Sequence, residues 1–134
     1  MSEFNNLNEE LLALGELIRE QFGTLGRVST DMVDISITED SNLRIEYPEY
    51  FQFVDSGRRR GSRMPPTSSL REWARQRSIP TDESTLFAIA RSISQDGIPP
   101  RPFLEMTFEQ ALDLYEDLLA EAVTIDIEQI IDEI

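Results

Sequence analysis

The sequence predicts an α+β fold: a small antiparallel β-sheet, formed by a hairpin plus one extra strand, flanked by an N-terminal helix, two short helices and a long C-terminal helix. Three observations lead to this prediction. Apolar residues recur at helical spacing near the N-terminus, alternate with polar residues over 33–47, and return to helical spacing from residue 67 onward. With 134 residues, of which 40% are apolar, we expect a single domain over residues 1–134.

The first element is a helix whose apolar residues stand three or four positions apart. Asparagines at positions 5, 6 and 8 offer an N-cap, and Gly23 is the expected stop. The apolar stripe comprises Leu7, Leu11, Leu14, Ile18 and Phe22.

A β-hairpin is expected next. Apolar and polar residues alternate over 33–37 and again over 43–47, and the segment TEDSN between them is rich in turn-forming residues. The segment YPEYFQFV then predicts a further short strand after Pro48, with Phe51 and Phe53 on one side.

Two short helices follow. In TSSLREWARQRS, the apolar face is formed by Leu70, Trp73 and Ala74. The segment PTDESTLFAIARSISQDG predicts a second helix with Thr81 as N-cap and Gly97 at its end. The segment IPPRPF must be extended, because its prolines do not tolerate a helix.

A long acidic helix is expected from Phe103 almost to the end of the chain, since apolar residues keep helical spacing throughout. The β-branched run VTIDI leaves open a break or a short strand near Thr124.

The composition removes the commonest catalytic side chains. The chain has no histidine, cysteine or lysine, and all 12 basic residues are arginine. It therefore lacks the usual zinc ligands, thiol nucleophiles and a Schiff-base lysine. No phosphate-binding loop, nucleophile elbow or metal-ligand spacing occurs. We expect a protein that is not an enzyme and that binds no metal and no cofactor.

No apolar run reaches the roughly 18 residues that a membrane-spanning helix needs, and the N-terminus lacks a signal-peptide pattern. We therefore expect no membrane partner and a chain that stays in the compartment where it is made.

The charge is unevenly distributed. The net charge is −14, yet residues 56–80 contain seven arginines and one acid, whereas residues 105–134 contain ten acids and no base. These segments predict a subunit or partner interface. Its candidate residues are the arginines Arg58, Arg59, Arg60 and Arg63, the acids Glu109, Asp113, Glu116 and Asp117, and the apolar Ile127, Ile130 and Ile131.

Three interpretations of the loop GRRRGSR, residues 57–63, remain open: a solvated turn, a phosphate contact, or a bidentate contact with carboxylates of a protein partner. We call residues 57–63 the arginine loop. Trp73 and the phenylalanines suggest either core residues, which their apolar stripes favour, or a stacking platform for bases. The two short helices also invite a helix-turn-helix interpretation, which Asp82 and Glu83 disfavour at the end that would meet phosphates.

The segments YFQFVDSGRRR, LREWARQRSI, LFAIARSISQDGI and PRPFLEM, in this order after a helix and a hairpin, resemble the neck and tail-completion proteins of tailed bacteriophages. These are also described as minor tail or head–tail connector proteins. The resemblance covers Tyr50 to Met106 and is most specific in FVDSGRR and GIPPRPFL.

The resemblance implies a structural virion protein, made in the host cytoplasm and assembled in the neck or tail as a ring between portal and tail, without catalytic residues. Its partners would be copies of itself and neighbouring portal, connector and tail proteins, with DNA only passing through the channel. In such a ring the arginine loop would meet residues 105–133 of the next copy, or an acidic surface of the adjoining ring. The acidic C-terminus departs from the family pattern and leaves the neck or tail-end position open. The alternative is an arginine-loop nucleic-acid-binding or regulatory module that acts outside a virion.

Overall fold

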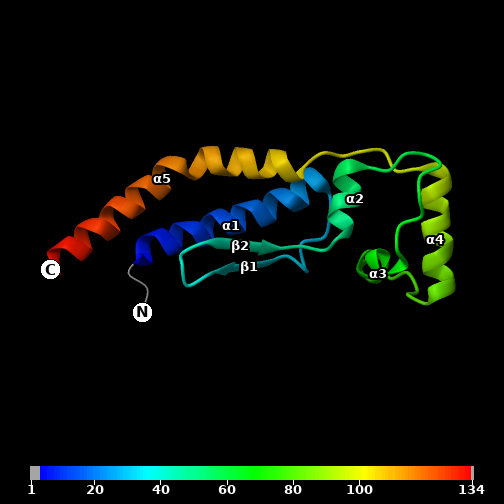
Figure 1. The fold of residues 1–134 in the computed structure, drawn as a ribbon, viewed down its shortest axis with the longest axis horizontal. Coiled ribbons are helices and arrows are strands. Elements are labelled where there is room, and N and C mark those ends of the chain that lie inside the picture. Colours follow the sequence, from blue (N-terminus) through cyan, green and yellow to red (C-terminus); the bar gives the residue numbers. More distant parts are fainter. Residues whose placement is uncertain (1–3, 134) are drawn as a thin grey trace.

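The structure, a computed structural model, describes residues 4–133 and confirms the α+β class. Within these residues it has five helices and a two-stranded antiparallel sheet (Figure 1). The elements are α1 (Asn5–Gly26), β1 (Asp34–Ile37), β2 (Leu43–Glu46), α2 (Tyr50–Ser56), α3 (Thr67–Gln76), α4 (Glu83–Asp96) and α5 (Leu104–Asp132).

Helix α1 is the centre of the larger part of the molecule. The long helix α5 runs antiparallel along one side of it, and the hairpin lies along the other (Figure 1). Phe22 of α1 is fully buried, and its ring meets those of Phe51 and Phe103 edge-on, each with 5.7 Å between centroids. The aromatic side chains of α1, α2 and the start of α5 therefore form one core.

The predicted hairpin is confirmed. Ile35 pairs with Ile45 and Ile37 pairs with Leu43, so the apolar residues of both strands lie on the same face. That face packs against α1, where Gly15 leaves room for the side chain of Ile35.

The predicted extra strand is wrong, because residues 50–56 form α2. The backbone N–H of Phe51 donates to the carbonyl of Pro48 at 3.0 Å, which begins the helix. Tyr50 and Phe51 are both buried and Val54 packs on the same core, which is the spacing of a helical face rather than the alternation of a strand. The run YFQFV is so short that its apolar residues fit the period of a strand as well as that of a helix. Packing against α1 favours the helix.

The first turn of α1 is capped by a side chain from α5. Phe4 stands at the N-cap position without a side-chain cap, so none of the three expected asparagines serves as N-cap. Instead, the fully buried carboxylate of Asp126 accepts hydrogen bonds from the backbone N–H of Asn6 at 3.1 Å and of Leu7 at 2.9 Å, and from the side-chain amide of Asn6 at 2.8 Å. Burial alone would raise the pKa of Asp126, but these hydrogen bonds outweigh it and hold that pKa below its ordinary value.

The first turn of α5 is capped in the same manner. Phe103 occupies the N-cap position without a side-chain cap, and Asp55 of α2 accepts from the backbone N–H groups of Phe103 at 2.7 Å and Leu104 at 2.9 Å. Each long helix thus relies on a distant carboxylate to satisfy N–H groups that have no partner inside the helix.

Several helix ends differ from the prediction. Helix α1 passes through Gly23 and ends at Gly26, followed by Arg27 in the left-handed conformation. The N-cap of α4 is Asp82 rather than Thr81, and the predicted end at Gly97 is confirmed. Helix α5 has no break at Thr124, whose hydroxyl donates to the carbonyl of Ala120 at 3.0 Å. Packing along α1 keeps this β-branched stretch helical.

Helices α3 and α4 enclose a second, smaller apolar cluster, and the half-buried Trp73 packs against both this cluster and the main core. The predicted apolar face of α3 is confirmed, with Leu70 and Ala74 buried.

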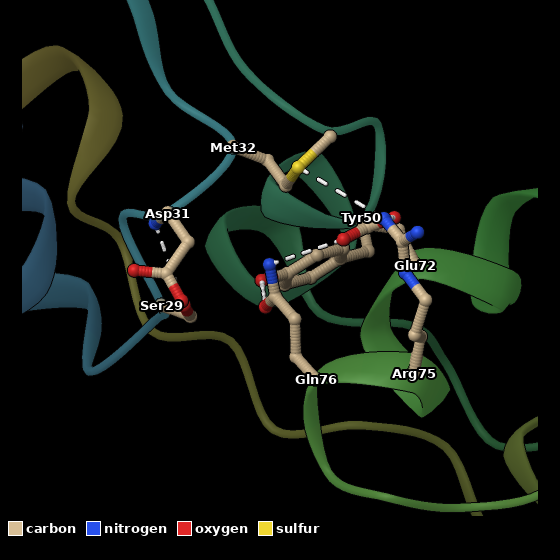
Figure 2. A network of polar contacts seen from close by, with 7 residues as sticks. All are labelled: Ser29, Asp31, Met32, Tyr50, Glu72, Arg75 and Gln76. Atoms are coloured by element: carbon tan, nitrogen blue, oxygen red, sulfur yellow. Dashed lines mark hydrogen bonds and ion pairs between the residues drawn. The ribbon is translucent and has the colours of Figure 1, made fainter.

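A polar network also joins α3 to the main core (Figure 2). The Tyr50 hydroxyl donates to Gln76 Oε1 at 2.6 Å, and Glu72 pairs with Arg75. Arg75 also reaches the sulfur of Met32 at 3.9 Å. Burial raises the pKa of Tyr50, so its hydroxyl remains a hydrogen-bond donor.

Candidate subunit interface

The arginine loop is fixed by backbone hydrogen bonds to the C-terminal end of α4. The N–H of Arg58 donates to the carbonyl of Ile98 at 2.9 Å, and the N–H of Ile98 donates back to the carbonyl of Arg58 at 2.9 Å. The N–H of Gly61 donates to the carbonyl of Ser94 at 2.7 Å. The loop therefore presents its side chains from a defined backbone position.

Two glycines make this approach possible. Gly57 and Gly97 have φ values of +66° and +75°. A Cβ on Gly57 would lie 2.4 Å from the carbonyl oxygen of Ile98, and one on Gly97 would lie 2.6 Å from that of Arg58. Any larger residue at either position would push the arginine loop away from α4.

The four arginines of the loop have different surroundings. Arg58 is half-buried: its guanidinium lies 5.0 Å from the ring centroid of Phe53 and donates to the carbonyl of Arg63. Arg59, Arg60 and Arg63 are exposed, and none forms an ion pair with any residue from 4 to 133. Three of the four predicted arginines are thus available to a partner, while Arg58 supports the loop.

The four predicted acids, Glu109, Asp113, Glu116 and Asp117, are all exposed on α5. No ion pair joins them to the arginine loop within the described part of the chain. The two groups therefore do not neutralise each other inside one subunit.

The predicted apolar residues near the end of α5 differ in their exposure to solvent. Ile127 and Ile131 keep 45% and 61% of their surface exposed, whereas Ile130 is half-buried. Because Asp126 anchors α5 at the first turn of α1, the turns after it project past the start of α1 (Figure 1). Ile127 and Ile131 thus form a small apolar surface on a projecting helix end, among Glu128 and Asp132.

A feature that the sequence did not reveal is an open apolar cavity between α2, α3 and α4, with a volume of about 400 Å³. Arg58 lies against Phe53 and Arg77 lies 4.7 Å from the ring centroid of Trp73, and both aromatic rings line the cavity. The rest of the lining comes from Tyr50, Val54, Leu70, Ile89, Ser92, Ile93 and Ile98. The cavity is therefore apolar inside and carries arginines beside its aromatic walls.

One sequence signal pointed toward this cavity. Trp73 and Arg77 are four residues apart at the end of a helix, a spacing that lets a guanidinium lie over the ring. The cavity itself depends on how three helices pack, which no local pattern encodes. The phenylalanines at positions 22, 51 and 103 are core, while Trp73 is half-buried and lines the cavity.

No cluster of three or more potential metal ligands occurs among residues 4–133. Over the same residues, no helix combines the length and the apolar character that crossing a membrane requires. Comparison of the chain with family models, with curated proteins and with solved structures returns no match.

Proposed function

We propose that this chain is a structural subunit of a ring at the head–tail junction of a tailed bacteriophage, joining portal or connector to tail. The proposal starts from the resemblance of residues 50–106 to neck and tail-completion proteins. Its two most specific segments, FVDSGRR and GIPPRPFL, contact each other directly through the paired hydrogen bonds of Arg58 and Ile98. This contact supports treating them as one functional unit.

The observation that carries the proposal is the separation of unpaired opposite charges within one subunit. Arg59, Arg60 and Arg63 are exposed beside α4, whereas the projecting acidic end of α5 lies at the opposite end of the molecule (Figure 1). Two different and complementary surfaces are what a head-to-tail contact requires, and repetition of such a contact closes a ring when the rotation permits.

The negative charge elsewhere suits a channel through which DNA passes. A net charge of −14 repels phosphate over most of the surface, so DNA would cross the ring without adhering to it. The competing interpretation, a nucleic-acid-binding module outside a virion, requires the same three arginines to contact phosphate.

Light scattering on the purified chain at low and high salt, with a duplex DNA titration on the same sample, separates these functions. We expect either a self-associated species or a monomer that joins a ring only when phage neck proteins are present. In both cases we expect no DNA binding. Salt-sensitive DNA binding by a monomer or dimer would replace the ring proposal with the nucleic-acid-binding alternative.

Charge reversal tests the arginine loop directly. We expect Arg59→Glu with Arg60→Glu to abolish self-association, because two attractive contacts become repulsive, while circular dichroism remains unchanged. Arg58 is left intact because it supports the loop. The matched control, Arg27→Glu with Arg91→Glu, changes net charge equally at exposed sites outside the loop, where the arginines also form no ion pair within residues 4–133, and should assemble normally. Equal assembly of both double variants would remove the loop from the interface.

A further inference from the structure

We propose that the apolar cavity between α2, α3 and α4 receives Ile127 and Ile131 from the α5 end of a second copy of this chain. The inference rests on the proposed ring function and names the contact that would hold neighbouring subunits together. It adds an apolar anchor to the charge complementarity described above.

The cavity offers a suitable surface. It has a volume of about 400 Å³ and is lined mainly by aromatic and aliphatic side chains, with Ser92 as a polar residue in the lining. It is open to solvent, and Trp73 and Phe53 in its wall are half-buried. Filling it with aliphatic side chains would remove this apolar surface from water.

Two arginines lie beside the cavity, together with Asp96, whose carboxylate accepts from the Ser92 hydroxyl at 3.2 Å. The arginines favour an acidic partner. The exposed Arg77 lies against Trp73 and is available to an acidic partner, whereas the half-buried Arg58 lies against Phe53 and supports the loop. Neither forms an ion pair within residues 4–133. The end of α5 combines exposed Ile127 and Ile131 with Glu128 and Asp132. An apolar centre with charges around it is the usual arrangement of a protein interface, and here the charges of the two surfaces are opposite in sign.

Another apolar groove of comparable size is a poorer receptor for this helix end. It measures about 360 Å³ and lies between α1, β2 and α5, with Phe108 and Leu112 in its wall. The two α5 residues in its wall are each followed in the sequence by an exposed acid, Glu109 and Asp113, and these acids would repel another acidic helix. Charge therefore distinguishes two cavities of similar size.

The contact must be intermolecular. The end of α5 and the α3–α4 pair lie at opposite ends of the molecule, so a subunit cannot fill its own cavity (Figure 1). Donor and receptor are different surfaces, so each subunit can bind one neighbour at each end.

Paired serine substitutions test the donor surface. In sedimentation experiments we expect Ile127→Ser with Ile131→Ser to weaken self-association by about tenfold or more, since burial of even one aliphatic side chain of this size contributes at least that factor. The control, Leu114→Ser with Leu118→Ser, removes two leucines that are 68% and 45% exposed on another face of α5. It should leave self-association unchanged.

Cross-linking tests the receptor independently. The chain has no cysteine, so Ser92→Cys and Ile131→Cys can be introduced into separate preparations and mixed with a short bis-maleimide. We expect a heterodimer of the two variants. Ser92→Cys mixed with Leu114→Cys should give none.

The results separate this inference from the function on which it rests. Unchanged assembly of the Ile127→Ser, Ile131→Ser variant, equal cross-linking through positions 131 and 114, or a wild-type chain that is monomeric at millimolar concentration each overturns the cavity contact. If DNA binding is also absent, the ring proposal survives and its contact lies elsewhere. Salt-sensitive DNA binding by a monomer overturns the ring proposal itself.

Discussion

At the residue scale, two carboxylates from distant parts of the sequence cap helices whose N-cap residues provide no side-chain cap. Asp126 accepts three hydrogen bonds at the start of α1, and Asp55 accepts two at the start of α5. Near a helix N-terminus, a carboxylate also interacts favourably with the helix dipole. These two side chains therefore link α1, α2 and α5 by polar contacts, in addition to the apolar core.

Replacing Asp126 with asparagine should lower the free energy of unfolding by about 1–2 kcal/mol, because one of its two acceptor oxygens becomes a donor facing an N–H group. Asp117→Asn, at an exposed position of the same helix, should change it by less than about 0.5 kcal/mol. Urea denaturation measures both. Equal effects of the two substitutions would show that Asp126 contributes nothing beyond its charge.

The difference between wild type and Asp126→Asn should depend on pH. The folded-state pKa of Asp126 is lowered from the ordinary value of 3.8, so its contribution is fully present above that value. It is lost as the pH falls through the folded-state pKa. Urea unfolding measured from neutral pH downward should show the free energies of unfolding of the two proteins converging only below pH 3.8. A difference that stays constant from neutral pH to well below 3.8 would contradict the assignment.

Two glycines offer a matched test of the arginine loop. In Gly61→Ala, the added Cβ has no atom within 4 Å. The substitution should therefore lower the free energy of unfolding only by the about 1–2 kcal/mol that an alanine in the left-handed conformation costs. Gly97→Ala should cost more, because its Cβ would also lie 2.6 Å from the carbonyl oxygen of Arg58 and would open the hydrogen bonds between Arg58 and Ile98. Urea denaturation measures the free energy of unfolding of both variants. Equal losses would mean that the chain relieves the close contact between a Cβ at position 97 and the carbonyl of Arg58 at little cost.

At the scale of elements, Trp73 is the apolar side chain of α3 that packs against both the cluster of α3 and α4 and the main core, in addition to the polar contacts that attach these helices. Trp73→Ala should destabilise the protein by about 2 kcal/mol, less than the 3–5 kcal/mol typical of a fully buried tryptophan. Hydrogen exchange should accelerate more in α3 and α4 than in α1 and α5. Phe87→Ala, at a residue of α4 that is 53% exposed, serves as the control and should leave exchange nearly unchanged.

The sequence predicted the elements whose periodicity extends over many residues, including the long helix α5 and the hairpin. It missed α2 because four aromatic or aliphatic residues within YFQFV fit either period over so short a stretch. It missed the caps of α1 and α5 because Asp126 and Asp55 are distant in sequence from the groups they bind.

The candidate interface was predictable only in part. Exposure of Arg59, Arg60 and Arg63 follows from their position in a glycine-bounded loop, and all three are exposed. The supporting role of Arg58 depends on the ring of Phe53 and on pairing with Ile98, which are properties of the folded chain. The cavity lined by Trp73 likewise arises from the packing of three helices.

At the scale of the whole molecule, charge acts in opposite directions on folding and on the proposed assembly. Helix α5 and the segment before α2 are both acidic, so like charges repel within one subunit. Between subunits, the arginine loop and the end of α5 would attract each other.

Salt should therefore stabilise the monomer and weaken the ring. Between 0.01 M and 0.5 M NaCl, roughly the range over which the Debye length falls from about 30 Å to below 8 Å, the thermal midpoint of the dilute monomer should rise by a few degrees. Over the same range, light scattering of the concentrated protein should show smaller species. A midpoint that falls with salt would mean that intramolecular ion pairs outweigh repulsion.

The cap of α1 also has a consequence for protein synthesis. The side chain that satisfies the first N–H groups of α1 is translated 120 residues after Asn6, which at cellular rates is a delay of about 6–24 s. During this interval the nascent chain holds a first helix with an uncapped end and no α5 to cover its side. If a ribosome stalls before residue 126, the first turn of α1 lacks its cap. We expect proteases to cleave such an unfinished chain near the start of α1.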